Sequence, residues 1–431
     1  MIRGFFEPKS VLFLGNTRIE MPHAMVSSAV FERVKSNLGK FDGEVHVVDL
    51  GKENRVSYPR ADLCILLLTP EETTRILDRI ESKHVLILPS GFTKKDKESI
   101  LRVAKKKGKR IIGPNSICGL LNPSIGLNTT YERDLPVRPG KISIVSQSGG
   151  VGASILDYLI SNKIGISKLV WLGNAWDVNE CDVLEYFVED RKTKVILMYI
   201  ESLREPRRFM RIVKKSKKPV IVLKGGVSKE SKERAKTHTE SLSTSDEIFA
   251  SALKQCGAIK AESIEELFGL GMLLEQYEGE KIKQIAIISN TGGAAILVAD
   301  QCHRHGICMA EFSGKTKNDI TKSYPEIEPF NPIDIIADAD GEKFKNVIEI
   351  VLKDKSVDAV VFVTQLRSCL LEPESLEVLK RIKTQKPLVN LTPGEDDYRK
   401  VRFFLGDCFP MFRDADILAR CLKKLVVWDI F

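Results

Sequence analysis

The chain has 431 residues, 43% of them hydrophobic, which is enough for several ordinary domains of roughly 100–200 residues each. Lysine and arginine total 66 against 58 aspartate and glutamate, and the formal net charge is +8. Such a mild excess on a large surface favours anionic partners only weakly, so we expect no nucleic-acid partner.

The nine cysteines are scattered, and no two of them form a CxxC pair. This pattern argues against a disulfide framework and indicates buried thiols in a reducing compartment. The opening residues MIRGFFEPKSVLFLGN lack a long apolar run before a cleavage site, and no segment reaches the roughly 18 apolar residues of a membrane helix. We therefore expect a soluble, cytoplasmic protein with no membrane partner.

Short apolar runs rich in β-branched residues alternate with amphipathic helical patterns along the chain. The first series of predicted strands covers 10–15, 44–50, 62–68, 84–90 and 109–114. A second series covers 141–146, 167–173, 193–202 and 218–226, and a third covers 283–289, 358–364 and 386–393. This alternation is typical of βαβ units and predicts an α/β fold of doubly wound parallel sheets.

Two junctions separate the three series. The segment DLPVRPGK (134–141) contains two prolines, and EGEKIK (278–283) is charged. We therefore predict three α/β domains, at 1–130, 131–277 and 278–431. In open α/β sheets, ligands bind at the carboxyl ends of the strands, so candidate functional residues are expected there.

Two predicted strands end in the same local design. One runs into QSGG (147–150) and the other into NTGG (290–293), and a helical pattern follows each. Glycines let the backbone turn tightly and leave amide groups free at a helix N-terminus, where the dipole favours an anion. One such turn is often purely structural, but its recurrence favours phosphate binding. The predicted phosphate-binding residues are Ser148, Gly149, Gly150, Thr291, Gly292 and Gly293.

A histidine lies in an unusual setting in KTHTESLSTSDE (236–247). His238 is surrounded by small hydroxyl and acidic residues, between a predicted strand and a helix that Ser245 is expected to cap. A neutral imidazole is a nucleophile towards phosphorus and carries a labile phosphoryl group. The residues alone leave two interpretations open, a solvated loop histidine and a phosphoryl carrier.

A set of longer motifs resembles one protein family in order and spacing. The motifs are SQSGGVGASILDYL (146–159), LGNAWDVNECDVLEYF (172–187), VILMYIES (195–202), VLKGG (222–226), AKTHTESLSTSDEIF (235–249), IEELF (264–268), NTGGAAILVAD (290–300) and NPIDIIADAD (331–340). They resemble the α subunit of the ADP-forming acyl-CoA synthetases, relatives of succinyl-CoA synthetase. The resemblance covers nearly the whole chain and is strongest between 141 and 340.

The resemblance implies a Rossmann-like, CoA-binding first domain followed by two flavodoxin-like domains. It also implies a reaction cycle in which acyl-CoA and phosphate give an acyl phosphate and free CoA, and the phosphoryl group then passes to a histidine and on to ADP. His238 matches the phosphorylated histidine, and Glu201 matches the carboxylate that holds and polarises it. The residues expected to contact CoA are Gly15, Asn16, Ser90 and Asn115.

The nucleotide chemistry is expected on another chain. No Walker loop GxxxxGK[ST] occurs, and the three predicted domains leave no room for the ATP-grasp portion of the family. The resemblance therefore implies an ATP-grasp β subunit that binds ADP or ATP with Mg²⁺, in an α2β2 assembly. We expect the pure chain to be unable to phosphorylate ADP.

The sequence departs from the family pattern in two places. Relatives read HTGSLAGS where this chain reads HTESLSTS (238–245), so two glycines are lost and Glu240 places a negative charge beside the histidine. The first turn, GNTRIEMPHAMV (15–26), has no further glycine after Gly15, although relatives are rich in glycine there. These departures leave open a non-catalytic or regulatory CoA-binding paralogue.

Other features are interpreted as structural. CHRHGIC (302–308) contains two Cys and two His, but His303 and His305 lie two residues apart at a predicted helix end and point to different faces, so no metal site is expected. The basic runs 105–110 and 214–219 end amphipathic helices just before strands, which is typical of solvated helix ends.

Overall fold

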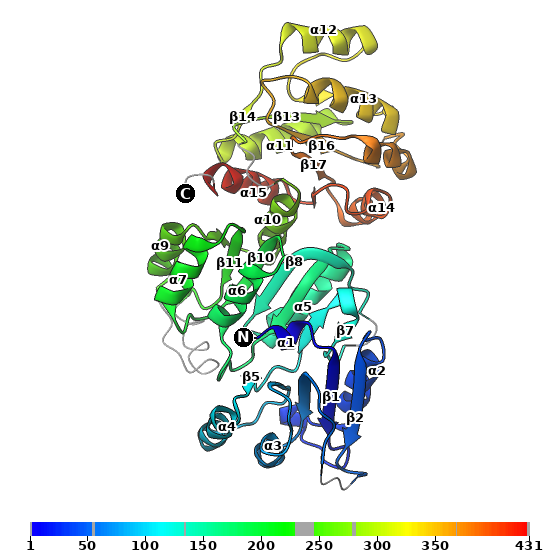
Figure 1. The fold of residues 1–431 in the computed structure, drawn as a ribbon. Coiled ribbons are helices and arrows are strands. Elements are labelled where there is room, and N and C mark those ends of the chain that lie inside the picture. Colours follow the sequence, from blue (N-terminus) through cyan, green and yellow to red (C-terminus); the bar gives the residue numbers. More distant parts are fainter. Residues whose placement is uncertain are drawn as a thin grey trace. The chain divides into compact units, whose positions relative to one another are not determined.

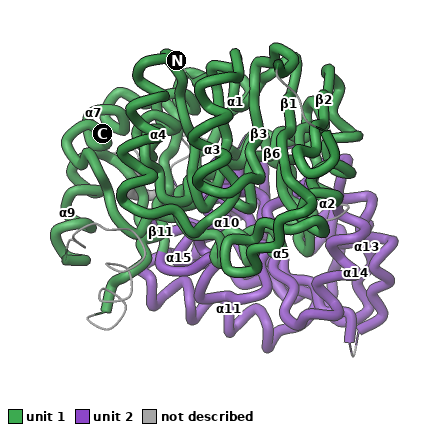
Figure 2. The backbone as a smooth tube through the Cα atoms, turned by 90° about the horizontal axis from the view of Figure 1, so that it is seen from below, with its two compact units in different colours: residues 1–261 green, residues 262–431 purple. Residues whose placement is uncertain are grey.

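The computed structural model describes residues 2–53, 57–132, 135–228, 245–277, 282–367 and 369–428. Its contacts divide the chain into two compact units, Met1–Ala261 and Glu262–Phe431 (Figure 2). No helix within these described ranges is long and apolar enough to cross a bilayer.

Strands and helices alternate through both units (Figure 1). The strands of the first unit are β1 (Ser10–Gly15), β2 (Glu44–Asp49), β3 (Leu63–Leu67), β4 (His84–Ile87), β5 (Arg110–Ile112), β6 (Leu120–Asn122), β7 (Leu127–Asn128), β8 (Pro139–Ser146), β9 (Ile166–Trp171), β10 (Val195–Ile200), β11 (Val220–Lys224) and β12 (Ile259–Ala261). Its helices are α1 (Arg3–Phe6), α2 (Ser28–Leu38), α3 (Pro70–Leu77), α4 (Lys94–Lys107), α5 (Gly149–Ser161), α6 (Glu180–Glu189), α7 (Pro206–Lys215) and α9 (Asp246–Cys256), with 3₁₀ turns η1 (Pro22–Ala24) and η2 (Pro123–Ile125).

The second unit continues the alternation. Its elements are α10 (Ile264–Gln276), β13 (Gln284–Ser289), α11 (Gly292–Arg304), β14 (Cys308–Met309), α12 (Gly314–Ser323), β15 (Ile333–Asp334), α13 (Gly341–Leu352), β16 (Ala359–Val363), η3 (Pro373–Arg381), β17 (Leu388–Leu391), α14 (Glu395–Leu405), β18 (Met411–Phe412) and α15 (Ala415–Trp428). The predicted α/β class with parallel sheets is confirmed.

The first unit contains two sheets. The strand order β2-β1-β3-β4-β5 forms a fully parallel sheet, and β3 is buried along its whole length because helices cover both faces of such sheets. The second sheet has the order β12-β11-β10-β8-β9-β6-β7, in which β8 to β12 are parallel and the short β6 and β7 form an antiparallel edge. The carboxyl ends of β8, β10 and β11 are therefore neighbours.

The sheet of the second unit has the order β14-β13-β16-β17-β18. Two short strands share one edge of β13, β14 at its start and β15 at its end. The Asn331 side chain fills the gap between them, because its amide nitrogen donates to the carbonyls of Ile285 (2.8 Å) and Ala310 (3.0 Å) and its oxygen accepts from the N–H of Ile287 (3.0 Å). The asparagine of the NPIDIIADAD motif thus bonds backbone groups of β13 at the gap between β14 and β15.

Helix α10 precedes the predicted domain boundary at 277, yet its contacts place it in the second unit. A Cβ added at Gly269 would lie 2.6 Å from the Phe412 ring and 3.0 Å from Cys421 Sγ on α15, so a glycine is required for this close approach. Buried Glu266 on α10 also pairs with Lys424 on α15. The three-domain division stays a prediction.

A buried ion pair fastens α1 to the second sheet of the first unit. Lys168 on β9 is fully buried, and its Nζ lies 2.6 Å from Asp190 Oδ2 and 3.7 Å from Glu7 Oε1. The Tyr186 hydroxyl donates to Glu7 (3.1 Å). Burial alone would raise the pKa of Asp190, but hydrogen bonds from Lys168 and Thr193 outweigh it and hold this pKa below its usual value. Asp190 is therefore ionised at neutral pH and forms an ion pair with Lys168.

Replacing Lys168 with methionine should lower the free energy of unfolding by about 3 kcal/mol, because it leaves the Asp190 carboxylate without its buried counter-ion. Since the folded pKa of Asp190 is depressed, this contribution exists above the unfolded pKa and is lost as the pH falls through the folded pKa. The free energy of unfolding in urea should thus differ between Lys168→Met and the wild type at pH 7, and this difference should be smaller below pH 4.

The matched control is Arg3→Met, which removes the exposed partner of Glu7. This variant should unfold close to the wild-type midpoint. Equal losses in the two variants would contradict the importance of the buried pair.

Candidate functional site

Parallel register brings three chain segments to one edge of the second sheet. Tyr199 on β10 pairs with Ser146 on β8, and Ile200 pairs with Lys224 on β11. The residues that follow these strands, Gln147, Glu201 and Gly225, consequently emerge side by side at the carboxyl edge. This is where α/β sheets bind ligands.

The first glycine turn leaves its amide groups open. Ser148 is the N-cap of α5, and its Oγ accepts from the N–H of Val151 at 3.4 Å. Gly149 and Gly150 are exposed; a Cβ at Gly149 would meet only Cys118 Sγ at 3.9 Å, and a Cβ at Gly150 would meet nothing within 4 Å. Protein packing therefore does not require these glycines, while the free N–H groups and the helix dipole suit an anion.

The second turn, in the other unit, repeats this design with one difference. Ser289 Oγ donates to the Thr291 carbonyl (2.9 Å), as Ser146 Oγ donates to the Ser148 carbonyl (2.9 Å). However, a Cβ at Gly292 would lie 2.9 Å from Asp334 Oδ2, so a carboxylate already lies beside this helix N-terminus. Like charges repel, which makes the first turn the better anion site. Phosphate binding at the two turns stays a prediction.

The N–H, the carbonyl and the carboxylate of Glu201 each have a partner. Its N–H donates to Gln147 Oε1 (2.8 Å), and its carbonyl accepts from Lys224 Nζ (2.9 Å). The Tyr199 hydroxyl donates to its carboxylate. Three groups from β8, β10 and β11 thus fix the backbone and the side chain of the residue predicted to hold the histidine.

Gln147 links Glu201 to a buried carboxyl group. Its Nε2 donates to the carbonyl of Ser202 (2.8 Å) and lies 3.4 Å from Glu180 Oε2. Glu180 is fully buried, and this burial raises its pKa, although Oε1 accepts from the Arg204 N–H at 2.6 Å. The loop after β10 is therefore tied to α6 as well as to β8.

Sequence reasoning missed Gln147, Tyr199, Lys224 and Glu180. The sequence contains two signals that could have identified Gln147 and Tyr199. Gln147 stands directly between a predicted strand and the Ser-Gly-Gly turn, and Tyr199 lies two residues before Glu201, hence on the same face of an extended strand. His238 lies outside the described residues, because the described ranges break between 228 and 245.

The four predicted CoA contacts are placed differently from one another. Gly15 is buried at the end of β1, where a Cβ would meet the Phe31 ring at 2.3 Å, so it serves packing. Asn16 donates to Glu72 Oε1 (2.7 Å). Asp49 Oδ1 accepts from the N–H groups of Thr17 and Gly51, each at 3.0 Å.

The turn after β1 is therefore closed by carboxylates. Burial opposes ionisation of Asp49, but the hydrogen bonds from Thr17 and Gly51 outweigh it and lower its pKa, so it is charged at neutral pH. In a glycine-rich turn, free N–H groups would be available to a phosphate. Here the N–H groups of Thr17 and Gly51 already donate to the Asp49 carboxylate.

Ser90 and Asn115 do come together. The Ser90 hydroxyl donates to the His23 carbonyl (3.0 Å), which joins the loop after β4 to the loop after β1. The Asn115 N–H donates to the Pro89 carbonyl (2.6 Å), and its side chain is exposed. These two residues lie at the edge where the resemblance places CoA.

Known proteins resemble this chain over most of its length. The family model of the succinyl-CoA ligase-like flavodoxin domain matches residues 139–274. The chain is 32% identical to the ADP-forming acetate–CoA ligase I of Archaeoglobus fulgidus over 97% of this chain and 62% of that protein. It is 31% identical to the α subunit of the ADP-forming acetate–CoA ligase II of Pyrococcus furiosus over 84% of this chain and 82% of that subunit.

The chain belongs to the family of ADP-forming acetate–CoA ligases. Its fold matches that of the dinucleotide-forming acetyl-coenzyme A synthetase 1 of Ca. Korarchaeum cryptofilum, solved with phosphate and ADP, with a TM-score of 0.83 and 25% identity. The match covers 98% of this chain and 96% of that one. The chain spans less than two thirds of the length of the Archaeoglobus ligase.

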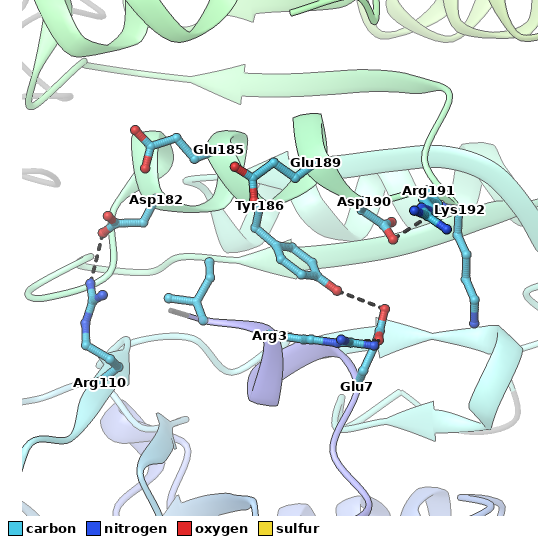
Figure 3. A pocket seen from close by; sticks show the side chains of 11 residues that line it. Arg3, Glu7, Arg110, Asp182, Glu185, Tyr186, Glu189, Asp190, Arg191 and Lys192 are labelled. Atoms are coloured by element: carbon cyan, nitrogen blue, oxygen red, sulfur yellow. Dashed lines mark hydrogen bonds and ion pairs between the residues drawn. The ribbon is translucent and has the colours of Figure 1, made fainter.

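The first unit also has a cavity of about 630 Å³ away from the predicted site residues (Figure 3). It is lined by Ile2, Arg3, Glu7, Arg110, Asp182, Glu185, Tyr186, Glu189, Asp190, Arg191 and Lys192. Much of its charge is paired internally, for example between Arg110 and Asp182 (3.1 Å). We interpret it as a gap beside the docked α1.

The segments that the sequence analysis interpreted as structural lie at helix ends. Helix α11 ends at Arg304, and His305 Nε2 lies 2.7 Å from Asp416 Oδ1. No cluster of three or more His, Cys, Asp or Glu suited to a metal ion occurs in the described ranges. Both basic runs span helix ends: 105–110 begins in the last turn of α4, which Gly108 caps, and 214–219 begins with the last two residues of α7.

Alanine substitutions in the two turns should show which of their glycines are required for protein stability. Gly150→Ala and Gly293→Ala should keep the stability or raise it by up to about 1 kcal/mol, because the methyl group enters open space and alanine favours helix. Gly292→Ala should instead lower stability, since its methyl group meets Asp334. Thermal unfolding measures this difference, and equal losses at all three positions would contradict it.

Proposed function

We propose that this chain is the α subunit of an ADP-forming acyl-CoA ligase, which interconverts acyl-CoA, ADP and phosphate with carboxylic acid, CoA and ATP. The observation that carries the proposal is the position of Glu201, whose N–H, carbonyl and carboxylate each have a partner and which emerges at the same edge of the sheet as the turn with the open amide groups of Gly149 and Gly150. A fixed carboxylate next to an anion-binding turn suits phosphoryl transfer to a histidine.

In the ATP-forming direction, a phosphate oxygen attacks the acyl carbonyl carbon, the C–S bond breaks, and CoA leaves as its thiolate. A nitrogen of His238 then attacks phosphorus, and the carboxylate leaves with the electrons of the P–O bond. Glu201 accepts a hydrogen bond from the other ring N–H and stabilises the imidazolium cation. The amides of Gly149 and Gly150 bind the phosphoryl oxygens, whose charge the helix dipole complements.

The last step transfers the phosphoryl group to ADP, and we assign this step to an ATP-grasp β subunit in an α2β2 assembly. The Pyrococcus relative is named as an α subunit, which supports a second polypeptide. ADP or ATP and Mg²⁺ belong to that partner, where the metal offsets the phosphate charge. We place the complex in the cytoplasm.

One observation favours a second candidate, a non-catalytic or regulatory CoA-binding subunit. The carboxylates of Asp49 and Glu72 accept hydrogen bonds from the turn after β1, where the family has a glycine-rich turn. Glu240 adds another negative charge beside His238. Both changes oppose the binding of phosphate groups.

Phosphorylation of His238 decides between these candidates. The chain is purified with its ATP-grasp partner and given γ-labelled ATP with Mg²⁺, or labelled phosphate with acetyl-CoA, and acid-labile, base-stable label is counted. We expect label on the wild type from both sides, none on His238→Ala, and no phosphorylation of ADP by the pure chain alone.

The matched control is His303→Ala, which removes a histidine at the C-terminal end of α11 and should leave the label unchanged. Absence of label on the wild-type complex from both sides would reject the catalytic proposal in favour of the non-catalytic subunit. Label that persists in His238→Ala would also reject it.

A further inference from the structure

The hydroxyl of Tyr199 reaches Glu201 because of local strand geometry. Tyr199 lies in β10, and Glu201 follows the last residue of that strand, so a single residue separates them. Tyr199 is half-buried, and its hydroxyl donates to the Glu201 carboxylate. The bond therefore runs along the edge of the candidate site.

A glycine on the neighbouring strand end leaves room for this bond. A Cβ added at Gly225, directly after β11, would lie 2.3 Å from the Tyr199 hydroxyl oxygen and 3.3 Å from Glu201 Cγ. The Gly225 N–H donates to the Ile200 carbonyl (2.9 Å), so the two segments are locked in register. Any side chain at 225 would consequently push the phenol away from the carboxylate.

The phenol is suited to donate rather than to ionise. Burial, followed by the charge and hydrogen bond of Glu201, raises the pKa of Tyr199 to about 12. The hydroxyl thus keeps its proton at neutral pH. A hydrogen bond to the ionised carboxylate favours the ionised form and fixes its orientation.

We infer that Tyr199 is a positioning residue for phosphoryl transfer, whose hydroxyl orients the Glu201 carboxylate in the space that Gly225 leaves open. This inference rests on the proposed phosphohistidine cycle. Tyr199 touches neither phosphate nor CoA in it and acts through Glu201.

Other ionisable groups surround the same segment. Lys224 from β11 donates to the Glu201 carbonyl, Glu180 from α6 is linked to it through Gln147, and Arg204 follows in the same loop. Their effects are common to wild type and variant. A hydrogen bond to an ionised carboxylate favours that form, so loss of the phenol hydroxyl should move the acidic limb of the phosphorylation rate to higher pH.

The test uses the complex with its ATP-grasp partner and measures single-turnover labelling of His238 by ATP and Mg²⁺ between pH 5 and pH 9. Tyr199→Phe should label about tenfold more slowly at neutral pH, as expected for one lost charge-assisted hydrogen bond. Its acidic limb should shift to higher pH, and KM for ATP should stay within about twofold because the nucleotide site is not touched. Gly225→Ala should have the same signature.

Tyr186→Phe is the matched control. Its hydroxyl also donates to a carboxylate, that of Glu7, but at the docked α1. It should change thermal stability and leave the labelling rate and its pH profile at wild-type values.

The outcomes separate the two proposals. Absence of label on the wild type rejects the phosphohistidine cycle itself. A labelled wild type with Tyr199→Phe and Gly225→Ala at wild-type rate and pH profile overturns the positioning role alone. A slower labelling rate that Tyr199→Phe and Tyr186→Phe share would also overturn it, because the shared loss would reflect lower stability of the fold. Should Tyr199→Phe fail to fold, Gly225→Ala decides by the same rate and profile.

Discussion

Parallel pairing of β8, β10 and β11 is the constraint on which the candidate site depends. The register places Ser146 beside Tyr199 and Ile200 beside Lys224, so that the ends of the three strands carry their next residues to one edge. From there, Gln147 and Lys224 hold the backbone of Glu201, and Tyr199 holds its carboxylate. A one-residue shift in the register of β10 would turn these side chains to the opposite face of the sheet, and the site would not form.

Electrostatics distinguishes the three turns that the family resemblance would connect with phosphate groups. The turn at Gly149 and Gly150 offers free amide groups without a nearby bonded carboxylate, whereas Asp334 lies beside Gly292. At the turn after β1, Asp49 already accepts the hydrogen bonds that an anion would need. The first of these is therefore the strongest candidate for a phosphoryl group.

Much of the fold was predictable because it depends on local pattern. Buried apolar runs such as LCILL gave the central strands, and Ser148, Thr291 and Ser245 precede helices as expected. The short strands β6, β7, β12, β14, β15 and β18 were missed, since two- or three-residue pairings carry no periodicity and depend on tertiary contacts. Asn331 illustrates this, because its role needs the backbone of β13 to be in place.

The candidate site was predictable only in part. The resemblance identified Glu201, and the glycine turns were found from their spacing. The partners of Glu201 come from strands far apart in the chain, so Gln147 and Lys224 could be linked to it only through the sheet order. The carboxylates that close the first turn were hidden for the same reason, since Thr17 meets Asp49 through the pairing of β1 with β2.

The central claim is that the edge formed by β8 and β10 is built to hold a phosphorylated histidine. A crystal structure of the complex trapped after phosphorylation by ATP and Mg²⁺ tests it most directly. The account predicts phosphoryl oxygens within about 3 Å of the N–H groups of Gly149 and Gly150, with Glu201 bonded to the imidazole of His238. A phosphohistidine facing solvent, with Glu201 turned away from it, would contradict the account.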